Sequence, residues 1–567
     1  MNRRVTSKKI FPFLNWELSR RSVRADFFAG LTVALVLIPQ SMAYAQLAGL
    51  PVVVGLYASF LPVIFGALWG ASHHLQSGPV AMTSLLTAAT LVPLAAPETA
   101  EYVVLAGALA LLLGVIRLLI GFFRLAEIAN FLSKPVLDGF IHAGVLVIAS
   151  SQISKLFGLQ MDHSGWYLRD LWQLLLDLPQ ANWLALLLGT GSIALLAVLK
   201  KVAPKLPAAL FVVAGTTGLV YLTGWSDPAR VAMPVSVVGN IPQGLPDFRL
   251  ALPDGAQLLK MIPGALAITF IGFMEMCGVA KAVAAKSKQA LDLNQEMIGQ
   301  GASALAAGLT GGYPVSGSLS RTALNYSAGA RTGLSSVFTG LIVAAFLMFM
   351  AGALHFLPQA ALGAIIIVAV VKLLDFRRLF FYWKISRIEG FIATCTFVST
   401  LCFAPQLQNG ILAGVALSMF YYLFSCMKPN VSLRACDASR ITNDVSLQEL
   451  AAAALPVMRF DGRLFFANAS YFEEELLRVL EACPESRFIG IDAKGINSID
   501  ATGVDLISAL VPELRRNGVE LIFCGLKPAV LGLLERGGVI AEIGEQNLYP
   551  HLNAVQKGFF SRADATG

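Results

Sequence analysis

Residues 311–322 have the sequence GGYPVSGSLSRT, a composition that no ordinary membrane-spanning helix has. The segment lies within a strongly apolar region, yet it is rich in glycine and serine, is interrupted by Pro314 and carries Arg321. Glycine and proline weaken a helix, and a charged side chain at the centre of a bilayer costs at least ~2.5–3.5 kcal/mol. Irregular backbone is tolerated at that depth only where it is buried in protein or lines a wet cavity. We therefore interpret residues 311–322 as a broken segment beside such a cavity.

A second segment, in the first half of the chain, repeats this pattern. Residues 76–83 have the sequence QSGPVAMT, so both segments contain Ser-Gly-x-x-x-x-Thr. Two interrupted apolar segments at corresponding places in two halves of a chain point to the binding site of a secondary transporter. A plain kinked helix is the alternative for either segment alone, and the pairing of the two segments argues against it.

The composition predicts that most of the chain lies in a membrane. Of its 567 residues, 56% are hydrophobic and 14% are charged, against roughly 25% charged in ordinary soluble proteins. The net charge of +7 comes from basic residues in short loops, so we relate it to membrane orientation and not to nucleic-acid binding. The seven cysteines lack metal-ligand spacing, and we predict no metal or other cofactor. Stretches without Asp, Glu, Lys or Arg are 178–199, 297–320, 332–371 and 390–427.

The apolar pattern predicts fourteen elements, because about 20 apolar residues cross a bilayer and the two longest uncharged stretches each divide at a proline. They form a transmembrane domain over residues 27–427, after an N-terminal segment at 1–26, and divide into seven plus seven. Two of them, 76–94 and 314–329, are the broken segments. The others are 27–47, 52–70, 102–123, 135–157, 180–199, 206–225, 261–281, 297–312, 333–353, 359–373, 388–404 and 409–427.

The charges of the loops predict the orientation. Arg124 and Lys134 lie in one loop and Arg377 and Arg378 in another, whereas the opposite loops hold acids such as Glu98. Cytoplasmic loops carry an excess of Lys and Arg. We therefore expect the N-terminus in the cytoplasm, and the even number of elements returns the C-terminus to the same side.

After residue 428 the composition becomes that of a soluble domain. Residues 456–467 have the pattern of a β-hairpin around Asp461-Gly462, and short buried-strand patterns follow at 488–492 and 521–525. Helical patterns lie at 470–482, 502–516 and 528–537. Alternating strands and helices predict a small α/β domain over residues 441–560, joined to the membrane by a linker at 428–440.

Several motifs together resemble one known family. In the membrane region these are IPQSMAYA at 38–45, PVVVGLYAS at 51–59, SGPVA at 77–81, GSLSRTALN at 317–325 and AGART at 328–332. They resemble the sulfate permease (SulP) family, also called solute carrier family 26. Residues 491–493 and 499–503 resemble its cytoplasmic STAS domain. The sequence departs from the family at Ser72-His73-His74, where a Lys or Arg usually follows the serine.

The resemblance implies a fold and a site. The fold is a fourteen-span inverted repeat, shared with nucleobase permeases such as the uracil permease, with a core domain (spans 1–4 and 8–11) and a gate domain (spans 5–7 and 12–14). The anion would lie between two half-helices whose N-termini face each other, and the family usually forms homodimers. The implied substrate-binding residues are Gln40, Tyr44, Val80, Ala81, Leu319, Ser320 and Arg321.

Electrostatics supports this implied site independently. A helix N-terminus carries about +0.5 charge and free N–H donors, so two facing ends offer roughly one positive charge. Arg321 would add positive potential; the alternative is that it snorkels to the membrane surface or pairs structurally. Without the motif match we would interpret Tyr44 and Gln40 as packing residues. The match is the only reason to consider them substrate-binding candidates.

Glu275, near the centre of span 261–281, is our proton-coupling candidate. We expect it to take up a proton during transport; the alternative is a fixed carboxylate that balances Arg321 or another cation. Sodium-coupled relatives place an acid at this position and a hydroxyl residue four positions later, where this chain has Val279. The resemblance therefore disfavours sodium.

Other polar residues have less specific interpretations. Asp138 and His142 share one helical face, which fits a proton relay less well than a satisfied interior hydrogen bond. We expect His73 and His74 to be solvated. Thr502 is a candidate for regulatory phosphorylation. The alternative is an N-cap, because Thr and Asp are common at the turn between a strand and a helix, and residues 500–503 are expected to form such a turn. We find no catalytic constellation and predict that the chain is not an enzyme.

We therefore predict a multi-pass anion transporter of a bacterial inner membrane, working as a proton symporter or an anion exchanger by alternating access. Sulfate, a C4-dicarboxylate or bicarbonate would fit as substrate. Lipid, a second copy of the chain and a cytoplasmic protein bound to the STAS domain are the expected partners. An uncoupled anion channel and a membrane-tethered anion sensor are the alternative functions.

Overall fold

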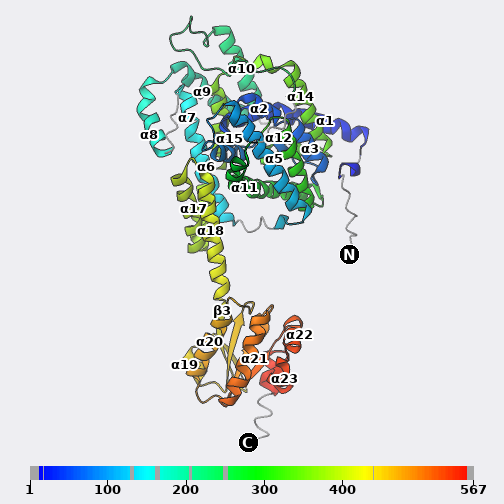
Figure 1. Ribbon diagram of the computed structural model, residues 1–567, viewed down its shortest axis with the longest axis vertical. Helices are drawn as coiled ribbons and strands as arrows, with labels where there is room; N and C mark the ends of the chain where they lie inside the picture. The colour runs from blue at the N-terminus through cyan, green and yellow to red at the C-terminus, as the bar shows by residue number, and fades with distance from the viewer. Residues whose placement is uncertain are drawn as a thin grey trace. The chain divides into compact units, whose positions relative to one another are not determined.

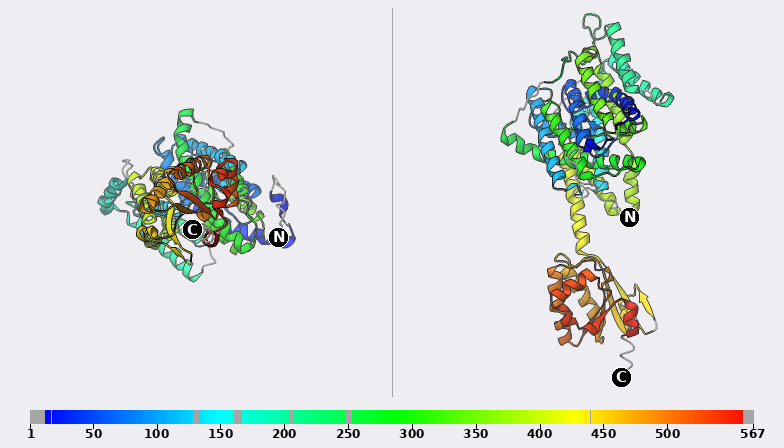
Figure 2. Two further views of the ribbon diagram at one scale, coloured as in Figure 1. Left: turned by 90° about the horizontal axis from the view of Figure 1, so that it is seen from below. Right: turned by 90° about the vertical axis from the view of Figure 1, so that its right-hand side faces the viewer.

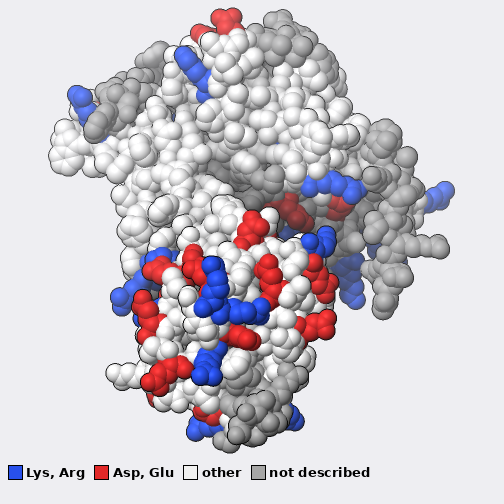
Figure 3. All heavy atoms as spheres, turned by 60° about the horizontal axis from the view of Figure 1, so that its bottom comes forward, with Lys and Arg blue, Asp and Glu red and all other residues white. Residues whose placement is uncertain are grey.

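The structure is a computed structural model that describes residues 12–16, 18–127, 133–159, 167–203, 207–246, 253–438 and 440–558. It contains two compact units, Met1–Ser418 and Met419–Gly567 (Figures 1 and 2). Lys, Arg, Asp and Glu are dense on the second unit and sparse on the visible face of the first (Figure 3). The expected N-terminal segment, 1–26, lies mostly outside the described residues.

The first unit is helical, and each of the fourteen predicted elements coincides with a helix, a pair of helices or a broken segment. Eight helices of the described part are long and apolar enough to span a bilayer. Helices α4 and α13, which follow the two broken segments, are half-helices of 11 and 9 residues. The helices of the first repeat and its connection are α1 (Arg20–Leu47), α2 (Val52–Tyr57), α3 (Leu61–Trp69), α4 (Ala81–Leu91), α5 (Ala100–Phe122), α6 (Lys134–Ser151), α7 (Ile153–Phe157), α8 (Tyr167–Asp177), α9 (Trp183–Val202) and α10 (Ala208–Thr223). Those of the second are α11 (Gly255–Ser287), α12 (Leu293–Leu309), α13 (Leu319–Ser327), α14 (Leu334–Phe349), α15 (Gln359–Val370), α16 (Phe376–Ile385), α17 (Arg387–Phe403) and α18 (Leu407–Met427).

Two of these helices were not predicted. Helices α8 and α16 have 11 and 10 residues, too short to cross a bilayer at 1.5 Å per residue. Both mix charged residues with exposed apolar ones, such as Trp172 in α8 and Phe380 in α16. Such amphipathic composition is typical of helices that lie along a membrane surface.

The membrane helices pack in two groups. Helices α1–α5 pack with α11–α14, and α6, α7, α9 and α10 pack with α15 and α17; the two groups meet mainly where α1 contacts α10 and α15. We call them the core group and the gate group. Small residues allow close approach within each group: a Cβ on Gly30 of α1 would lie 2.5 Å from the Ser335 carbonyl, and one on Gly139 of α6 would lie 2.3 Å from the Ala393 carbonyl.

The second unit is a six-stranded sheet covered by helices. The strand order is β4-β3-β5-β6-β7-β8, antiparallel from β4 to β5 and parallel from β5 to β8. Buried side chains alternate along β5, so that Met458 and Val457 belong to clusters on opposite faces. The strands are β3 (Asn430–Cys436), β4 (Ile441–Asn443), β5 (Leu455–Asp461), β6 (Phe488–Asp492), β7 (Glu520–Cys524) and β8 (Leu548–Tyr549). The helices are α19 (Leu447–Ala451), α20 (Ala469–Ala482), α21 (Ala501–Arg516), α22 (Pro528–Arg536) and α23 (Val539–Ile543).

Two predictions for this unit are wrong. The expected hairpin at 456–467 does not form, because β5 ends at Asp461 and pairs with β3 and β6 instead of with the residues that follow it. The expected linker at 428–440 contains β3, which pairs with both β4 and β5. In both cases pairing with a distant strand decides the structure, and a local turn signal does not report that pairing.

Candidate anion-binding site

The two broken segments meet through their main chains. Strand β1 (Ser77–Gly78) pairs antiparallel with β2 (Ser316–Gly317). The Ser318 N–H donates to the Gln76 carbonyl at 2.9 Å, and the Gln76 N–H donates to Thr322 Oγ1 at 3.0 Å. These bonds satisfy backbone groups that have left the helical pattern at membrane depth. The predicted pairing of the two segments is therefore present in the fold.

A half-helix begins immediately after each strand. Helix α4 begins at Ala81, and its N-cap, Val80, has no side-chain capping bond. Helix α13 begins at Leu319, and its N-cap Ser318 accepts from the Arg321 N–H at 3.5 Å. The first N–H groups of a helix have no partner within the helix. Because β1 pairs with β2 and a helix follows each strand, the N-termini of α4 and α13 lie close together, and each carries about +0.5 charge.

The two ends differ in access. Val80 and Ala81 are buried, each 8% exposed, whereas Leu319 is 60% exposed and Ser320 is also exposed. The start of α13 is therefore the more accessible side of this candidate site.

Helix α1 supplies Gln40 and Tyr44, one turn apart, as the motif implied. Tyr44 is buried and lies within electrostatic range of both Arg321 and Glu275. Gln40 Oε1 is buried and has no hydrogen-bond partner in the described structure. An acceptor without a partner is unusual in a protein interior, so this polar atom is available to a bound group or water.

Arg321 reaches from α13 to the start of α4. Its side chain is 1% exposed, and its Nη1 donates to the Pro79 carbonyl at 2.8 Å. Nε and Nη2 have no partner, and no carboxylate oxygen of the described residues lies within 4.0 Å of the guanidinium. The snorkelling alternative is therefore wrong, and Arg321 brings a buried positive charge to the paired half-helices.

Glu275 lies on α11 and is partly buried. No hydrogen bond or ion pair of its side chain with another described residue is present, so it does not form a salt bridge with Arg321. Val279, one turn later, is buried and offers no oxygen ligand. The geometry therefore leaves the carboxylate of Glu275 free to exchange a proton or to face a bound ion.

A model of the sulfate permease family matches residues 23–396. The chain belongs to the sulfate permease family. A model of the STAS domain matches residues 449–555 of this sulfate permease. The family match makes it a multi-pass membrane transporter and not an enzyme, as predicted.

Individual relatives agree with this assignment. The chain is 33% identical over 558 residues to the probable sulfate transporter 4.2 of Arabidopsis thaliana, covering 95% of this chain and 81% of that protein. It is 34% identical over 553 residues to the probable sulfate transporter MT1781 of Mycobacterium tuberculosis, covering 96% and 97%. The murine solute carrier 26 family member A9 anion transporter, solved in the inward-facing state, has the same fold, with a TM-score of 0.87 at 24% identity over 99% of this chain and 96% of that one. The predicted fold class is confirmed.

The other predicted polar residues have structural roles in this sulfate permease. His142 Nδ1 bonds to the Asp138 carbonyl at 2.6 Å, and its Nε2 accepts the Asp375 N–H at 2.9 Å. Asp138 Oδ2 accepts from the Tyr382 hydroxyl at 2.6 Å, so the interior hydrogen-bond interpretation is confirmed. His74 is buried against Tyr326, and the expectation that it is solvated was wrong.

In the STAS domain the N-cap of α21 is Asp500, which accepts from the Gly503 N–H at 2.9 Å. Thr502, two residues into the helix, is exposed and does not cap it. The exposed hydroxyl is compatible with the proposed regulatory role, which stays a prediction.

The sequence prediction did not include Arg117, a buried residue of α5 that donates a hydrogen bond to the residue before β2. The signal was present, because an arginine inside a predicted span marks a functional site by default. Arg117 lies outside the motifs that resemble the family, and the sequence prediction therefore did not include it.

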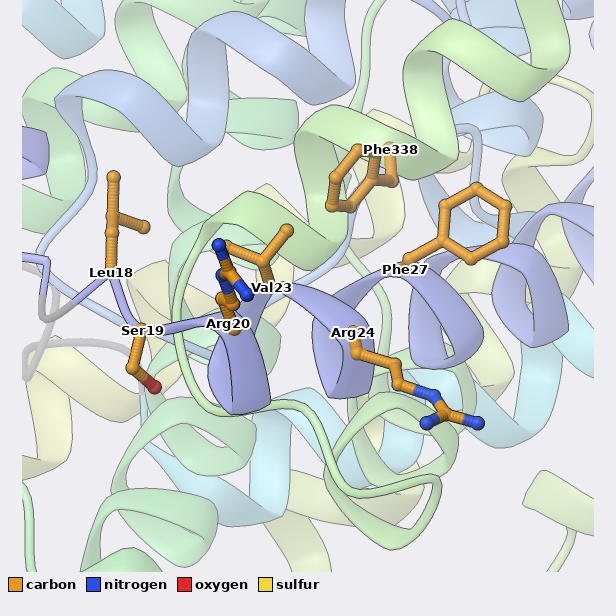
Figure 4. Close-up of a pocket in the computed structure, with 7 residues that line it drawn as sticks. All are labelled: Leu18, Ser19, Arg20, Val23, Arg24, Phe27 and Phe338. Atoms are coloured by element: carbon orange, nitrogen blue, oxygen red, sulfur yellow. The ribbon is translucent and has the colours of Figure 1, made fainter.

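Two hollows on the membrane unit lie apart from this site. One, of about 520 Å³, lies at the start of α1, where Figure 4 shows the rings of Phe27 and Phe338 beside each other, 5.4 Å between centroids. The other is a groove of about 1490 Å³ along α3, α5 and α12, largely apolar and bounded by polar residues such as Asn294. Neither hollow is lined by the start of α4 or of α13.

Proposed function

We propose that this sulfate permease binds a small anion between the N-termini of α4 and α13 and carries it across the membrane by alternating access. The observation that carries the proposal is the β1–β2 pair, which brings two uncapped or weakly capped helix ends together beside the unpaired nitrogens of Arg321. Helix N-termini bind anions through free N–H groups and the helix dipole. Fixed dipoles also allow release, since no mobile cation has to leave with the substrate.

Sulfate is the first candidate substrate, because two relatives that are similar over most of the chain are named probable sulfate transporters. A C4-dicarboxylate and bicarbonate remain the other two candidates, since apolar Val80 and Leu319 beside backbone donors do not select for size. The test is uptake of labelled sulfate into proteoliposomes, with competition by the other anions across a range of pH. Absence of uptake and of competition for every anion would refute the proposed function.

The coupling ion is proposed to be a proton, taken up by Glu275. The carboxylate lies within electrostatic range of Tyr44, has no ion-pair partner among the described residues, and faces no hydroxyl ligand for sodium at Val279. In proteoliposomes with an acidic exterior, the wild type should accumulate anion, and Glu275→Gln should equilibrate anion without accumulating it. Full accumulation by Glu275→Gln, or a requirement for sodium, would refute this coupling.

Two other functions use the same site and are separable by experiment. An uncoupled anion channel would pass current in proportion to the anion gradient, whereas an exchanger would need a counter-anion on the opposite side. A membrane-tethered sensor would bind anions without flux. Transport is favoured over sensing because the core and gate groups contact each other mainly at α1, so one group can move relative to the other.

The localisation, orientation and oligomeric state of the protein are also proposals. We place the protein in a bacterial inner membrane, as a homodimer with both termini in the cytoplasm. The orientation is proposed because Arg124 after α5, Lys134 at the start of α6, and Arg377 and Arg378 in α16 belong to connections that the fourteen-span topology assigns to one side. Surrounding lipid and a cytoplasmic partner of the STAS domain complete this setting. The orientation can be tested with Thr502→Cys in sealed, oriented vesicles. A membrane-impermeant thiol reagent should label this cysteine only from the cytoplasmic side.

A further inference from the structure

A second buried arginine, Arg117, contacts the main chain that leads into β2. Arg117, on α5, is 1% exposed, and its Nη1 donates to the Val315 carbonyl at 2.7 Å. Val315 is the residue directly before β2. Arg117 therefore holds the main chain that leads into the second broken segment.

The structure gives Arg117 no counter-charge. Its Nη2 has no hydrogen-bond partner, and no carboxylate oxygen of the described residues lies within 4.0 Å of it. Two buried acids of the core group accept from backbone donors: Asp26 accepts from the Arg331 N–H at 2.6 Å, and Glu296 accepts from the Ser72 N–H at 2.7 Å. Glu275 of α11 forms no ion pair with Arg117. An arginine stays protonated in proteins, and a buried charge without a partner is strongly disfavoured. A bound anion would supply the missing negative charge.

Arg117 and Arg321 each donate to a main-chain carbonyl of one broken segment, Arg321 directly after β1 and Arg117 directly before β2. Arg321 donates to the Pro79 carbonyl, just before α4, and Arg117 donates to the Val315 carbonyl, just before β2. Each guanidinium keeps at least one buried nitrogen without a partner. Each broken segment is thus held next to its strand by one buried guanidinium.

A glycine on α11 makes room for this arrangement. A Cβ on Gly272 would lie 3.1 Å from Arg117 Nη2 and 2.9 Å from Ser316 Oγ, and Ser316 Oγ itself donates to the Gly272 carbonyl at 3.1 Å. Gly272 lies three residues before Glu275, so the two share a face of α11. Arg117 therefore packs against the helix that carries the proton-coupling candidate as well as against β2.

We propose that Arg117 is a positioning residue that holds β2 and adds a second fixed positive charge to the anion site, thereby favouring divalent over monovalent anions. This inference rests on the proposed function. Coulomb energy is proportional to the product of the two charges. Loss of the Arg117 charge therefore weakens the binding of both kinds of anion. The decrease in the logarithm of the affinity should be twice as large for a divalent anion as for a monovalent one. The fold-loss for a divalent anion should be about the square of the fold-loss for a monovalent one.

The experiment compares sulfate with nitrate in proteoliposomes containing the full-length protein, by competition against a labelled anion at fixed pH. In Arg117→Gln, which keeps a hydrogen-bond donor and loses the charge, a ~3-fold loss for nitrate should accompany a ~10-fold loss for sulfate. Arg117→Lys keeps the charge but not the planar fork, so uptake should slow while the sulfate-to-nitrate affinity ratio stays within about twofold of the wild type. Arg124→Gln, at an exposed position two residues after the end of α5, is the matched control for net charge and should behave as the wild type.

Several outcomes would overturn the inference. Equal losses for the two anions in Arg117→Gln would assign Arg117 a structural role alone. If Arg117→Gln is not recovered folded, Arg117→Lys decides, because a changed affinity ratio with the charge retained would contradict an electrostatic role. Absence of anion binding by the wild type would instead refute the proposed function, so the two failures are distinguishable.

Discussion

A charge reversal at the start of α13 tests the candidate site most directly. Ser320 is the second residue of that helix, is exposed, and lies next to Arg321 in the sequence. A carboxylate at a helix N-terminus stabilises the helix by about 0.3–1 kcal/mol. Ser320→Glu should therefore fold at least as well as the wild type while it places a negative charge where the proposed anion binds.

The expected loss of affinity follows from the charges. Two helix ends of about +0.5 each and Arg321 give the site roughly two positive charges. A carboxylate about 4–6 Å from a monovalent anion repels it by ~3–4 kcal/mol at an effective dielectric constant of 20. Because Ser320 is exposed, solvent screening reduces this repulsion. We therefore expect KM for a monovalent anion to rise at least about tenfold, and KM for a divalent anion to rise by about the square of that factor.

The assay is concentration-dependent uptake by proteoliposomes that contain equal amounts of folded protein. Ser320→Gln is the matched control, because glutamine has the size of glutamate without its charge. A KM for Ser320→Glu within twofold of that for Ser320→Gln would mean that the anion does not lie at the start of α13, and the reasoning would be refuted.

Three further predictions concern the surrounding structure. Gly78 has φ +142°, and a Cβ there would lie 3.3 Å from Arg321 Nη2, so Gly78→Ala should strain the β1–β2 pair and lower maximal uptake severalfold at normal expression. Asp500, the N-cap of α21, accepts the N–H groups of Gly503 in that helix and of Phe466 in the loop after β5, so Asp500→Ala should destabilise the STAS domain by about 1–2 kcal/mol in chemical denaturation of the full-length protein; an unchanged midpoint would contradict the cap. Tyr382→Phe removes the hydroxyl donor to Asp138 and should lower the thermal stability of the gate group by about 1–3 kcal/mol without changing KM; a raised KM would instead indicate a role in binding.

The broken segments were predictable because glycine, proline and serine at bilayer depth violate the rules for a spanning helix in both halves of the chain. Those same rules predicted neither how exposed Leu319 would be nor where Arg321 would point, since both depend on packing between distant helices. The site residues themselves came from the family resemblance, and the composition alone left Tyr44 and Gln40 as packing residues.

The failures have equally specific causes. Strand β3 alternates apolar residues at Val431, Leu433 and Ala435, a strand signal that its position directly after the last membrane helix obscured. Asp461-Gly462 has the composition of a tight turn, yet the residues of β5 pair with residues of β3 and β6 that lie 19 or more positions away in the chain. Helix α16 was missed because its basic residues were counted as loop charges, although aromatic residues between them form an amphipathic helix.

The β1–β2 pair also constrains how a bound ion can leave. Drawing the two half-helices apart would expose unsatisfied main-chain N–H and C=O groups to apolar surroundings, at a cost of several kcal/mol for each group. We therefore expect segments 76–78 and 316–318 to stay together during the proposed transport cycle. Under the proposed alternating access, the ion would move together with the protein that encloses it, and α1 would slide against α10 and α15, the helices that it contacts in the gate group.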